Sequence, residues 1–395
     1  MSNYPYEILE KLYPHQKKAI DAIDKYIANY NNDKDKSSGL IVMPPGSGKS
    51  IVTKAIAAYN KYSNGVLILT NRKILSDYYK QLFLKDEIIQ FNTSFAVKSL
   101  QEITLRESEY ENQSNQKLII TGTIQYLHNA LKRDYQIYKE INNRINSIID
   151  LVIFDAEFKD IPDSWLNVLS NLFCPIVYIK SYVQRSDFKK LNVKEEYSYI
   201  LSLKEFFEEQ MQGKIRVVKR KHFKKPVEFA EDILKLINSG EIDLSADKKL
   251  LIKCNSFDQI IEIKEYLQYN TQTKVIGIHS KFTNENSNYN NIPRNEESGL
   301  IWIYQSMLND LDRTEFKYLA IFPEAISRRE LIQNTFNLVR GLNKDKTIAH
   351  LFDHSVKGNY GEIWEDYVNF QQEEDSGSVS ISVEDEPEYT YSNIV

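Results

Sequence analysis

Residues 39–50, GLIVMPPGSGKS, decide the fold, because they place a glycine-rich loop between an apolar run and a helical pattern. This is the context that a phosphate-binding loop requires. Two glycines let the backbone curl so that its N–H groups face the phosphates, and the helix N-terminus adds its positive dipole end. We expect Lys49 to reach the outer phosphates and Ser50 to ligate Mg²⁺. The sequence therefore predicts a site for ATP and Mg²⁺, formed by Pro45, Gly46, Ser47, Gly48, Lys49 and Ser50.

The match to this loop covers its core and not its full length. Met43 occupies the first position, where the strict pattern has Gly, so only GxGK[ST] is satisfied. A chance Gly-Ser turn before a helix is the alternative interpretation. The apolar run before the loop and the helical pattern after it favour the nucleotide site.

Short apolar runs alternate with longer amphipathic stretches along most of the chain. VLILT, KLIITGT, DLVIFD and PIVYIKS precede residue 182, and KLLIKCN, KVIGIHS, GLIWIYQ, YLAIF and TIAHLFD follow residue 226. Short β-rich runs joined by helical segments are typical of a parallel sheet covered on both faces. We therefore predict an α/β protein with two tandem domains, each a mainly parallel sheet flanked by helices.

Charge marks the expected boundaries. Residues 214–225, KIRVVKRKHFKK, contain seven Lys or Arg, and residues 371–395 contain seven Asp or Glu and no Lys or Arg. We place a first lobe at residues 1–205, a basic connector at 206–228, a second lobe at 229–370 and a disordered acidic tail at 371–395. The net charge of −5 comes mostly from the tail, so it neither supports nor excludes nucleic-acid binding.

Several classes of protein are disfavoured. The two cysteines, Cys174 and Cys254, lie far apart in apolar runs, which argues against a disulfide framework or a cysteine-based zinc site. The chain has no apolar stretch of about 18 residues and no basic-then-apolar N-terminal segment. We expect a cytoplasmic protein without a membrane segment.

Further motifs, in order along the chain, resemble those of superfamily 2 helicases, and most closely the motor domains of type I and type III restriction enzymes. They are LYPHQKKAIDAI (12–23), LTNRKILSDYYKQ (69–81), TGTIQYL (121–127), LVIFDAEF (151–158), SMLNDLDRTEFKYLAIF (306–322) and SRRELIQNTFNLVRG (327–341). The resemblance implies two RecA-like lobes with ATP bound between them. It also implies an ATP-dependent nucleic-acid translocase.

The resemblance assigns nucleotide contacts to both lobes. Gln16 would read the adenine edge, Asp155 would hold Mg²⁺ with Ser50, and Asp312 would contact the nucleotide from the second lobe. Gln333 and Arg340 would act on the phosphates, with Asn337 standing where a further Arg is usual. From the residues alone, Gln16 could instead be a surface side chain, although its position relative to the loop favours adenine. Arg340 could instead close a helix before a glycine.

The resemblance also assigns nucleic-acid contacts. Arg72, Thr123 and Gln125 would hold the backbone of the strand, which gives binding indifferent to sequence. The connector cations Lys219, Arg220 and Lys221 would line the same groove, although a solvated charged linker explains them as well. We expect DNA rather than RNA, and a protein partner that carries a nuclease or recognition function.

Ala156 departs from the family pattern in a way that bears on catalysis. It stands where the family has the Glu that activates the attacking water, and losing a general base typically costs about 10² to 10⁴ in rate. Glu157 follows, but along a strand it would point to the opposite face from residue 156. A natural loss of hydrolysis and an engineered Glu-to-Ala change both explain Ala156.

Three functions therefore stay open. The first is an ATP-hydrolysing motor, acting within a defence or DNA-processing complex by analogy with the family. The second is a hydrolysis-deficient scaffold or sensor subunit that binds ATP and nucleic acid. The third, a kinase or another small phosphate-loop NTPase, leaves the second α/β series unexplained.

Overall fold

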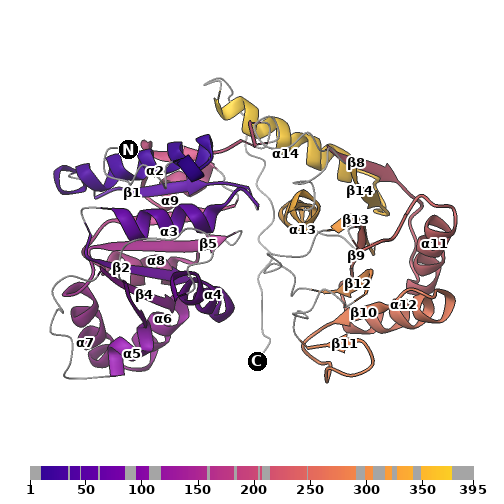
Figure 1. Cartoon of the computed structure of the whole chain (residues 1–395), viewed down its shortest axis with the longest axis horizontal. Coiled ribbons are helices and arrows are strands. Elements are labelled where there is room, and N and C mark those ends of the chain that lie inside the picture. The colour runs from indigo at the N-terminus through magenta and orange to yellow at the C-terminus, as the bar shows by residue number, and fades with distance from the viewer. Residues whose placement is uncertain are drawn as a thin grey trace.

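A computed structural model describes residues 10–33, 36–44, 46–60, 63–84, 95–105, 117–157, 161–181, 185–202, 205–206, 214–246, 248–290, 299–305, 316–322, 327–340 and 348–375. These residues form two lobes, each built on one seven-stranded sheet (Figure 1). Every pairing between the named strands is parallel. The predicted fold class, two tandem parallel α/β lobes of RecA-like type, is confirmed. Pro45 and Asp312 lie outside the described residues.

The sheet of the first lobe has the order β3-β4-β2-β5-β6-β1-β7. Its strands are β1 (Ser38–Val42), β2 (Gly65–Thr70), β3 (Phe95–Ser99), β4 (Lys117–Thr123), β5 (Leu151–Glu157), β6 (Ile176–Lys180) and β7 (Val193–Ile200). Side chains alternate between the two faces of each strand. In β2, Val66 and Ile68 join one apolar cluster, while Leu67 and Leu69 join the other.

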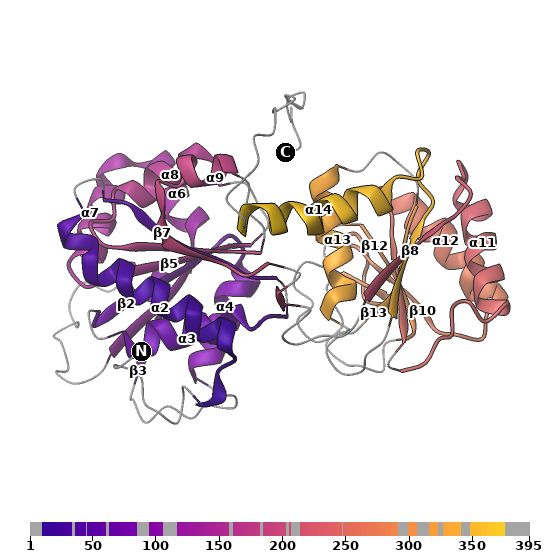
Figure 2. The same cartoon turned by 90° about the horizontal axis from the view of Figure 1, so that it is seen from above.

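Helices cover both faces of this sheet (Figure 2). On one face lie α2 (Pro14–Asn29), α3 (Lys49–Tyr59) and α4 (Lys73–Leu84). On the other lie α5 (Leu100–Leu105), α6 (Ile124–Arg133), α7 (Tyr135–Asn146) and α8 (Asp163–Ser170); α9 (Arg185–Lys190) precedes β7. Since both faces are buried, inner strands such as β1 and β2 are almost continuously apolar, as the runs GLIVM and VLILT predict.

The sheet of the second lobe has the order β11-β10-β12-β9-β13-β14-β8. Its strands are β8 (Lys214–Lys219), β9 (Lys249–Lys253), β10 (Val275–Ile278), β11 (Asn288–Tyr289), β12 (Ile301–Tyr304), β13 (Phe316–Ile321) and β14 (Ile348–Asp353). One face packs against α11 (Pro226–Asn238) and α12 (Phe257–Asn270), and the other against α13 (Arg328–Arg340) and α14 (Tyr360–Asp375). In Figure 1, α11 and α12 lie on the side away from the first lobe.

The basic connector and the start of the acidic tail contain regular secondary structure that the sequence did not predict. Lys214–Lys219, expected within a basic connector, forms the edge strand β8 and pairs with β14 along its length. Ile215 and Val217 are half-buried on one face of β8, Val218 is half-buried on the other, and Arg216 is exposed. Helix α14 extends to Asp375, and residues 376–395 lie outside the described residues. No helix among the described residues is long and apolar enough to cross a membrane.

Candidate nucleotide and nucleic-acid site

The loop between β1 and α3 has the backbone that a phosphate site needs. Gly46 and Gly48 have φ angles of 84° and 88°, in the left-handed region that glycine adopts without a steric penalty. Ser47 is buried, and its hydroxyl donates to the carbonyl oxygen of Pro44 at 2.5 Å. Helix α3 then begins at Lys49 with no side-chain cap, so the N–H groups of its first turn are suited to bind an anion.

The Lys49 side chain folds back over this loop. Its Nζ donates to the carbonyl oxygen of Met43 at 3.1 Å and to that of Pro44 at 3.3 Å. The side chain is half-buried, so the ammonium group stays beside the loop backbone. A phosphate oxygen is a stronger partner for an ammonium group than a neutral carbonyl. Lys49 therefore lies beside the loop, and its role as the phosphate-binding cation stays a prediction.

Gln16 supports the loop from α2. Its Nε2 donates to the carbonyl oxygen of Ser47 at 3.0 Å, and its Oε1 accepts from the backbone N–H of Tyr13 at 3.0 Å. His15 Nε2 lies 3.0 Å from the same Ser47 oxygen. The carboxamide expected to read adenine is thus bonded to the loop itself. Sequence reasoning missed His15, although its place beside Gln16 in YPHQ was the available signal.

Asp155 lies near the carboxyl end of β5, between Thr70 of β2 and Ile179 of β6 in the strand register. It is buried, and Tyr79 of α4 donates its phenol O–H to Asp155 Oδ2 at 2.7 Å. Burial, followed by the charge of Asp155, raises the pKa of Tyr79 well above its ordinary value. The phenol therefore remains a donor. Sequence reasoning missed Tyr79, because a tyrosine in an amphipathic helix resembles a core residue.

The donor set suits Mg²⁺. Ser50 is the second residue of α3, which follows β1. Asp155 lies near the carboxyl end of β5, two strands from β1 in the same parallel sheet, so both residues lie at its carboxyl edge. Among the described residues, no group of three or more His, Cys, Asp or Glu could hold a metal. Mg²⁺ bound to nucleotide needs no such group, because one carboxylate, a hydroxyl, water and phosphate oxygens complete its shell.

Ala156 is buried in the apolar cluster on the opposite face of the sheet, with Phe154, Ile161 and Tyr178. The register of β5 against β6 shifts between Asp155 and Glu157, which is a β-bulge or a similar irregularity. A bulge interrupts the regular alternation of a strand and re-aims the side chains beyond it. The side chain of Glu157 lies outside the described part of the structure, and its direction stays a prediction.

The three residues expected to touch nucleic acid from the first lobe lie together. Thr123 ends β4 beside Thr70, and Arg72 follows Thr70 by two residues. Gln125 Nε2 donates to the backbone oxygen of Asn71 at 2.5 Å, which joins the two strand ends. Helices α4 and α6 begin at these ends, at Lys73 and Ile124, so two helix N-termini converge there.

Asn71, between the end of β2 and the start of α4, has a buried side-chain amide without hydrogen bonds in the described part of the structure. Its side chain is 3% exposed, yet neither Nδ2 nor Oδ1 has a hydrogen-bond partner within the described part of the chain. Gln125 Oε1 is buried and unpaired in the same way. Each such atom costs about 1 to 3 kcal/mol, and native structures contain few. Sequence reasoning missed Asn71, which lies beside the predicted Arg72.

The three connector cations lie elsewhere. Arg220 Nη2 and Nε donate to Asp232 at 2.8 and 3.1 Å, so its guanidinium already has a carboxylate partner instead of the expected phosphate. Lys219 and Lys221 are exposed at the carboxyl end of β8, from which the chain leads to α11. Since α11 lies on the far side of the second lobe in Figure 1, the structure does not bring these cations to Arg72.

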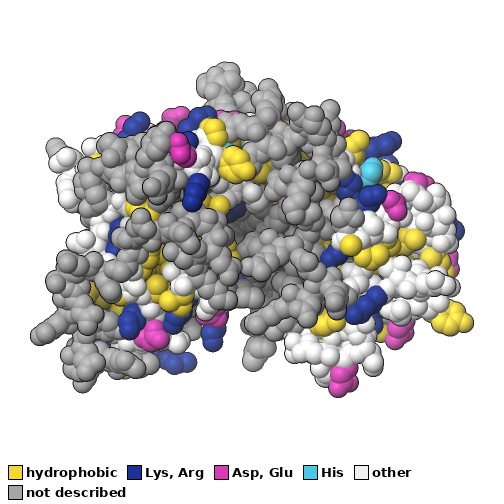
Figure 3. Space-filling model, in the orientation of Figure 1, with side chains coloured by type: hydrophobic (Ala, Val, Ile, Leu, Met, Phe, Trp, Pro, Cys, Tyr) yellow, Lys and Arg dark blue, Asp and Glu magenta, His cyan; other side chains and the backbone are white. Residues whose placement is uncertain are grey.

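Asp232 is the centre of a polar cluster inside the second lobe. Besides the Arg220 ion pair, it accepts from His354 Nε2 at 3.2 Å, and His354 is fully buried. Burial by itself opposes ionisation of Asp232, but the hydrogen bonds from His354 and Arg220 outweigh it and lower its pKa to about 2. On the face shown in Figure 3, the described Lys and Arg side chains are scattered over both lobes and form no single patch.

Helix α13 supplies the remaining candidates. Gln333 is half-buried, while Asn334 and Asn337 are buried. Tyr304 donates a hydrogen bond to Asn334 Oδ1. Burial raises the pKa of Tyr304 well above its ordinary value, and a hydrogen bond with Asn337 opposes this rise. Asn337, in the place of an expected Arg, therefore bonds within its own lobe. The side chain of Arg340 lies outside the described part of the structure.

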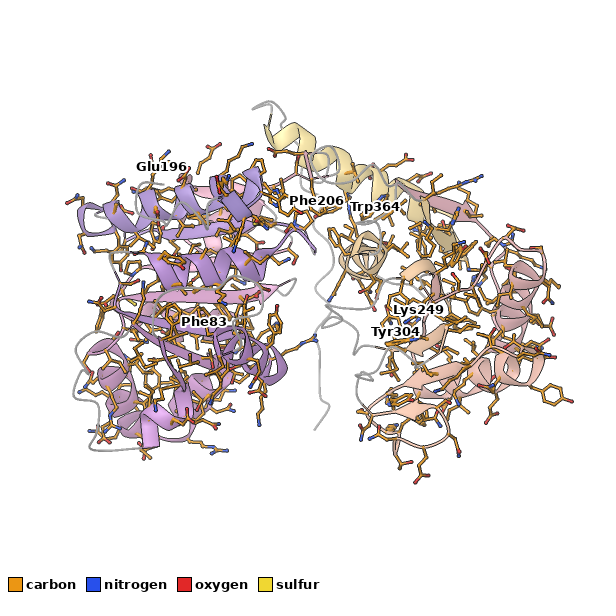
Figure 4. The ribbon with its side chains drawn as sticks, in the orientation of Figure 1. Phe83, Glu196, Phe206, Lys249, Tyr304 and Trp364 are labelled. Carbon is orange, nitrogen blue, oxygen red and sulfur yellow. The ribbon has the colours of Figure 1, made fainter. Side chains whose placement is uncertain are left out.

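Figure 4 shows Phe206 and Trp364 where the two lobes approach each other.

Comparisons with known proteins give a family match for the first lobe and a fold match for most of the chain. Residues 9–177 match the family described as type III restriction enzyme, res subunit. No curated protein sequence matches the chain. The fold is similar to a fragment described as the HsdR subunit of a type I restriction enzyme from Vibrio vulnificus YJ016, with a TM-score of 0.53 and 15% sequence identity. The similarity covers 88% of this chain and 65% of that one, so this chain spans just under two thirds of its length.

Proposed function

We propose that the chain is an ATP-dependent nucleic-acid translocase of superfamily 2, because residues 9–177 match the type III restriction enzyme, res subunit family. One observation carries the proposal. The glycine-rich loop with Lys49, the buried Asp155, and the strand ends with Asn71 and Gln125 all lie at the carboxyl edge of one parallel sheet. In open α/β sheets, this edge is where ligands bind.

The phosphates of ATP would be held by the loop N–H groups and the first turn of α3, with Lys49 neutralising the outer phosphates. Ser50 and Asp155 would hold Mg²⁺, which when bound neutralises charge on the β- and γ-phosphates. From the second lobe we assign Gln333, Arg340 and Asp312 to the phosphate side. Closure of the lobes on ATP would then change the grip on the strand.

The nucleic-acid side would use the converging ends of β2 and β4. Two helix N-termini and Arg72 favour phosphate oxygens, and the unpaired amide of Asn71 offers both a donor and an acceptor. Thr123 and Gln125 complete this group. Lys219 and Lys221 are secondary candidates, since they lie in the other lobe and away from these residues. We propose DNA as the substrate, in line with the restriction-enzyme resemblance.

A second candidate function is a hydrolysis-deficient subunit that binds ATP and nucleic acid as a scaffold or sensor. Ala156 favours it, because a methyl group buried among apolar side chains cannot take a proton from water. Either way, we propose a protein partner with a nuclease or recognition function and a setting in a defence or DNA-processing complex.

The test is ATP hydrolysis by the chain with single- and double-stranded DNA and RNA, measured for the unmodified chain, Lys49→Ala and Ala156→Glu. The translocase proposal expects nucleic-acid-stimulated hydrolysis in the unmodified chain, and none in Lys49→Ala. Tight Mg·ATP binding with hydrolysis only in Ala156→Glu would favour the scaffold or sensor. Absence of nucleotide binding and hydrolysis in all three would refute both.

A further inference from the structure

Tyr79 makes a hydrogen bond to Asp155 from a helix that carries none of the loop residues. The phenol O–H donates to Oδ2 at 2.7 Å, the tyrosine is fully buried and Asp155 is 5% exposed. An O–H···O⁻ bond between buried groups is strong and directional. It therefore fixes both the position and the rotation of this carboxylate.

The same phenol also faces α3. Thr53 Oγ1 lies 3.4 Å from Tyr79 OH and itself donates to the carbonyl oxygen of Lys49 at 3.0 Å. Because Thr53 already has a backbone acceptor, the Tyr79 proton is directed to Asp155. Tyr79 thus lies between the helix that starts with Lys49 and the strand that ends near Asp155.

We infer that Tyr79 is a positioning residue for the Mg²⁺-binding carboxylate, so that it sets the affinity of the ATP site for Mg²⁺ without touching the nucleotide. The inference rests on the proposed ATP site. The bond from Tyr79 to Oδ2 would hold the Asp155 carboxylate in one orientation, in which it would serve as a ligand for Mg²⁺. Groups that orient a metal ligand in this way typically change metal affinity or activity by about 10- to 100-fold when they are removed.

The test is a Mg²⁺ titration of ATP binding, followed with a fluorescent N-methylanthraniloyl derivative of ATP. In Tyr79→Phe the ring and its packing stay, and only the hydroxyl is lost. We expect the Mg²⁺ concentration for half-maximal binding to rise by about tenfold or more, while binding of the nucleotide in EDTA stays within about twofold. A general loss of structure would weaken both.

Two further variants make the test specific. Tyr78→Phe removes a phenol from the adjacent position of α4 and is expected to leave the Mg²⁺ midpoint unchanged. Adding Tyr79→Phe to Asp155→Asn is expected to shift the midpoint by less than about twofold, because Tyr79 acts through Asp155.

The outcomes separate this inference from the proposed function. If the unmodified chain binds Mg·ATP and Tyr79→Phe has the same Mg²⁺ midpoint, Tyr79 does not position the carboxylate and the inference alone fails. Equal shifts from Tyr79→Phe with and without Asp155→Asn would also overturn it. If the unmodified chain binds no Mg·ATP, the proposed ATP site fails and the inference fails with it.

Discussion

Gln16 lies so close to Gly48 that a Cβ atom added to Gly48 would be 2.1 Å from the Gln16 amide nitrogen. The same nitrogen donates to the carbonyl oxygen of Ser47, so the side chain holds the loop on one side while glycine leaves room for it. The adenine contact expected of Gln16 would require its amide to serve the loop and the base together. The pair therefore links the segment before β1 to the shape of the phosphate-binding loop.

A side chain at position 48 would displace the Gln16 amide. Gly48→Ala should weaken ATP binding, because the methyl group meets Gln16 and because φ of 88° costs a residue with a side chain about 1 to 2 kcal/mol. Isothermal titration with Mg·ATP measures the effect. Gly240→Ala is the matched control: its φ is 79° with nothing within 4 Å of the added carbon, so it should cost some stability and leave ATP binding intact.

Replacing Ala156 tests the missing base. Ala156→Glu should raise the rate of ATP hydrolysis by about 10² to 10⁴, if the chemistry lacks only a proton acceptor. Ala156→Gln has nearly the same size and should not raise it. Because residue 156 is 1% exposed among apolar side chains, both variants should melt at a lower temperature than the unmodified chain. Equal hydrolysis rates in the two variants would contradict the role assigned to this position.

The two sets of candidate nucleic-acid cations can be told apart by salt. Arg72→Ala should weaken DNA binding and reduce the slope of log affinity against log salt by about 0.7 to 0.9, the loss of one phosphate contact. Lys221→Ala should leave the slope unchanged, since Lys221 lies near Phe223 at the far end of β8. Fluorescence anisotropy with labelled DNA at several salt concentrations gives both slopes. The reverse pattern would move the contact to the second lobe.

Acid stability should depend on Asp232. Its folded pKa of about 2 lies below the ordinary value of 3.8, so the unfolded chain binds more protons between these values. The stabilisation is therefore complete above about pH 4 and is lost as the pH falls towards 2. Asp232→Asn should lower the melting temperature at pH 7 and flatten its change in this window. Asp243→Asn, in an exposed pair with Lys248, should change neither by much.

The fold could be predicted from the sequence because both lobes obey one local rule. Strands buried on both faces are short continuous apolar runs, and these alternate with helices in GLIVM, VLILT and their counterparts. The strand at Lys214–Lys219 was not predicted, since its charges suggested a linker. Its partner β14 lies more than a hundred residues later, and pairing at that distance leaves no local signal.

The candidate site was predictable only in part, because contacts between residues far apart in the sequence leave no local signal. Loop residues such as Lys49 depend on local spacing, and the structure places them together as the sequence predicts. The contact between Tyr79 and Asp155 joins residues 76 positions apart, and the one between Arg220 and Asp232 competes with the expected phosphate contact. Composition cannot indicate which of two available acceptors a donor will find. Burial and geometry decide it.

The covalent link between the lobes runs from β7 to β8, and each of these is the outermost strand of its sheet. The lobes are therefore joined at one edge of each sheet. The strands next to these edge strands are β1 in the first lobe and β14 in the second. A rotation about an axis moves nearby atoms little and distant atoms far. A rotation of the lobes about this link would therefore move β1 and its phosphate-binding loop less than β3 and β11, which lie at the opposite edges of the two sheets.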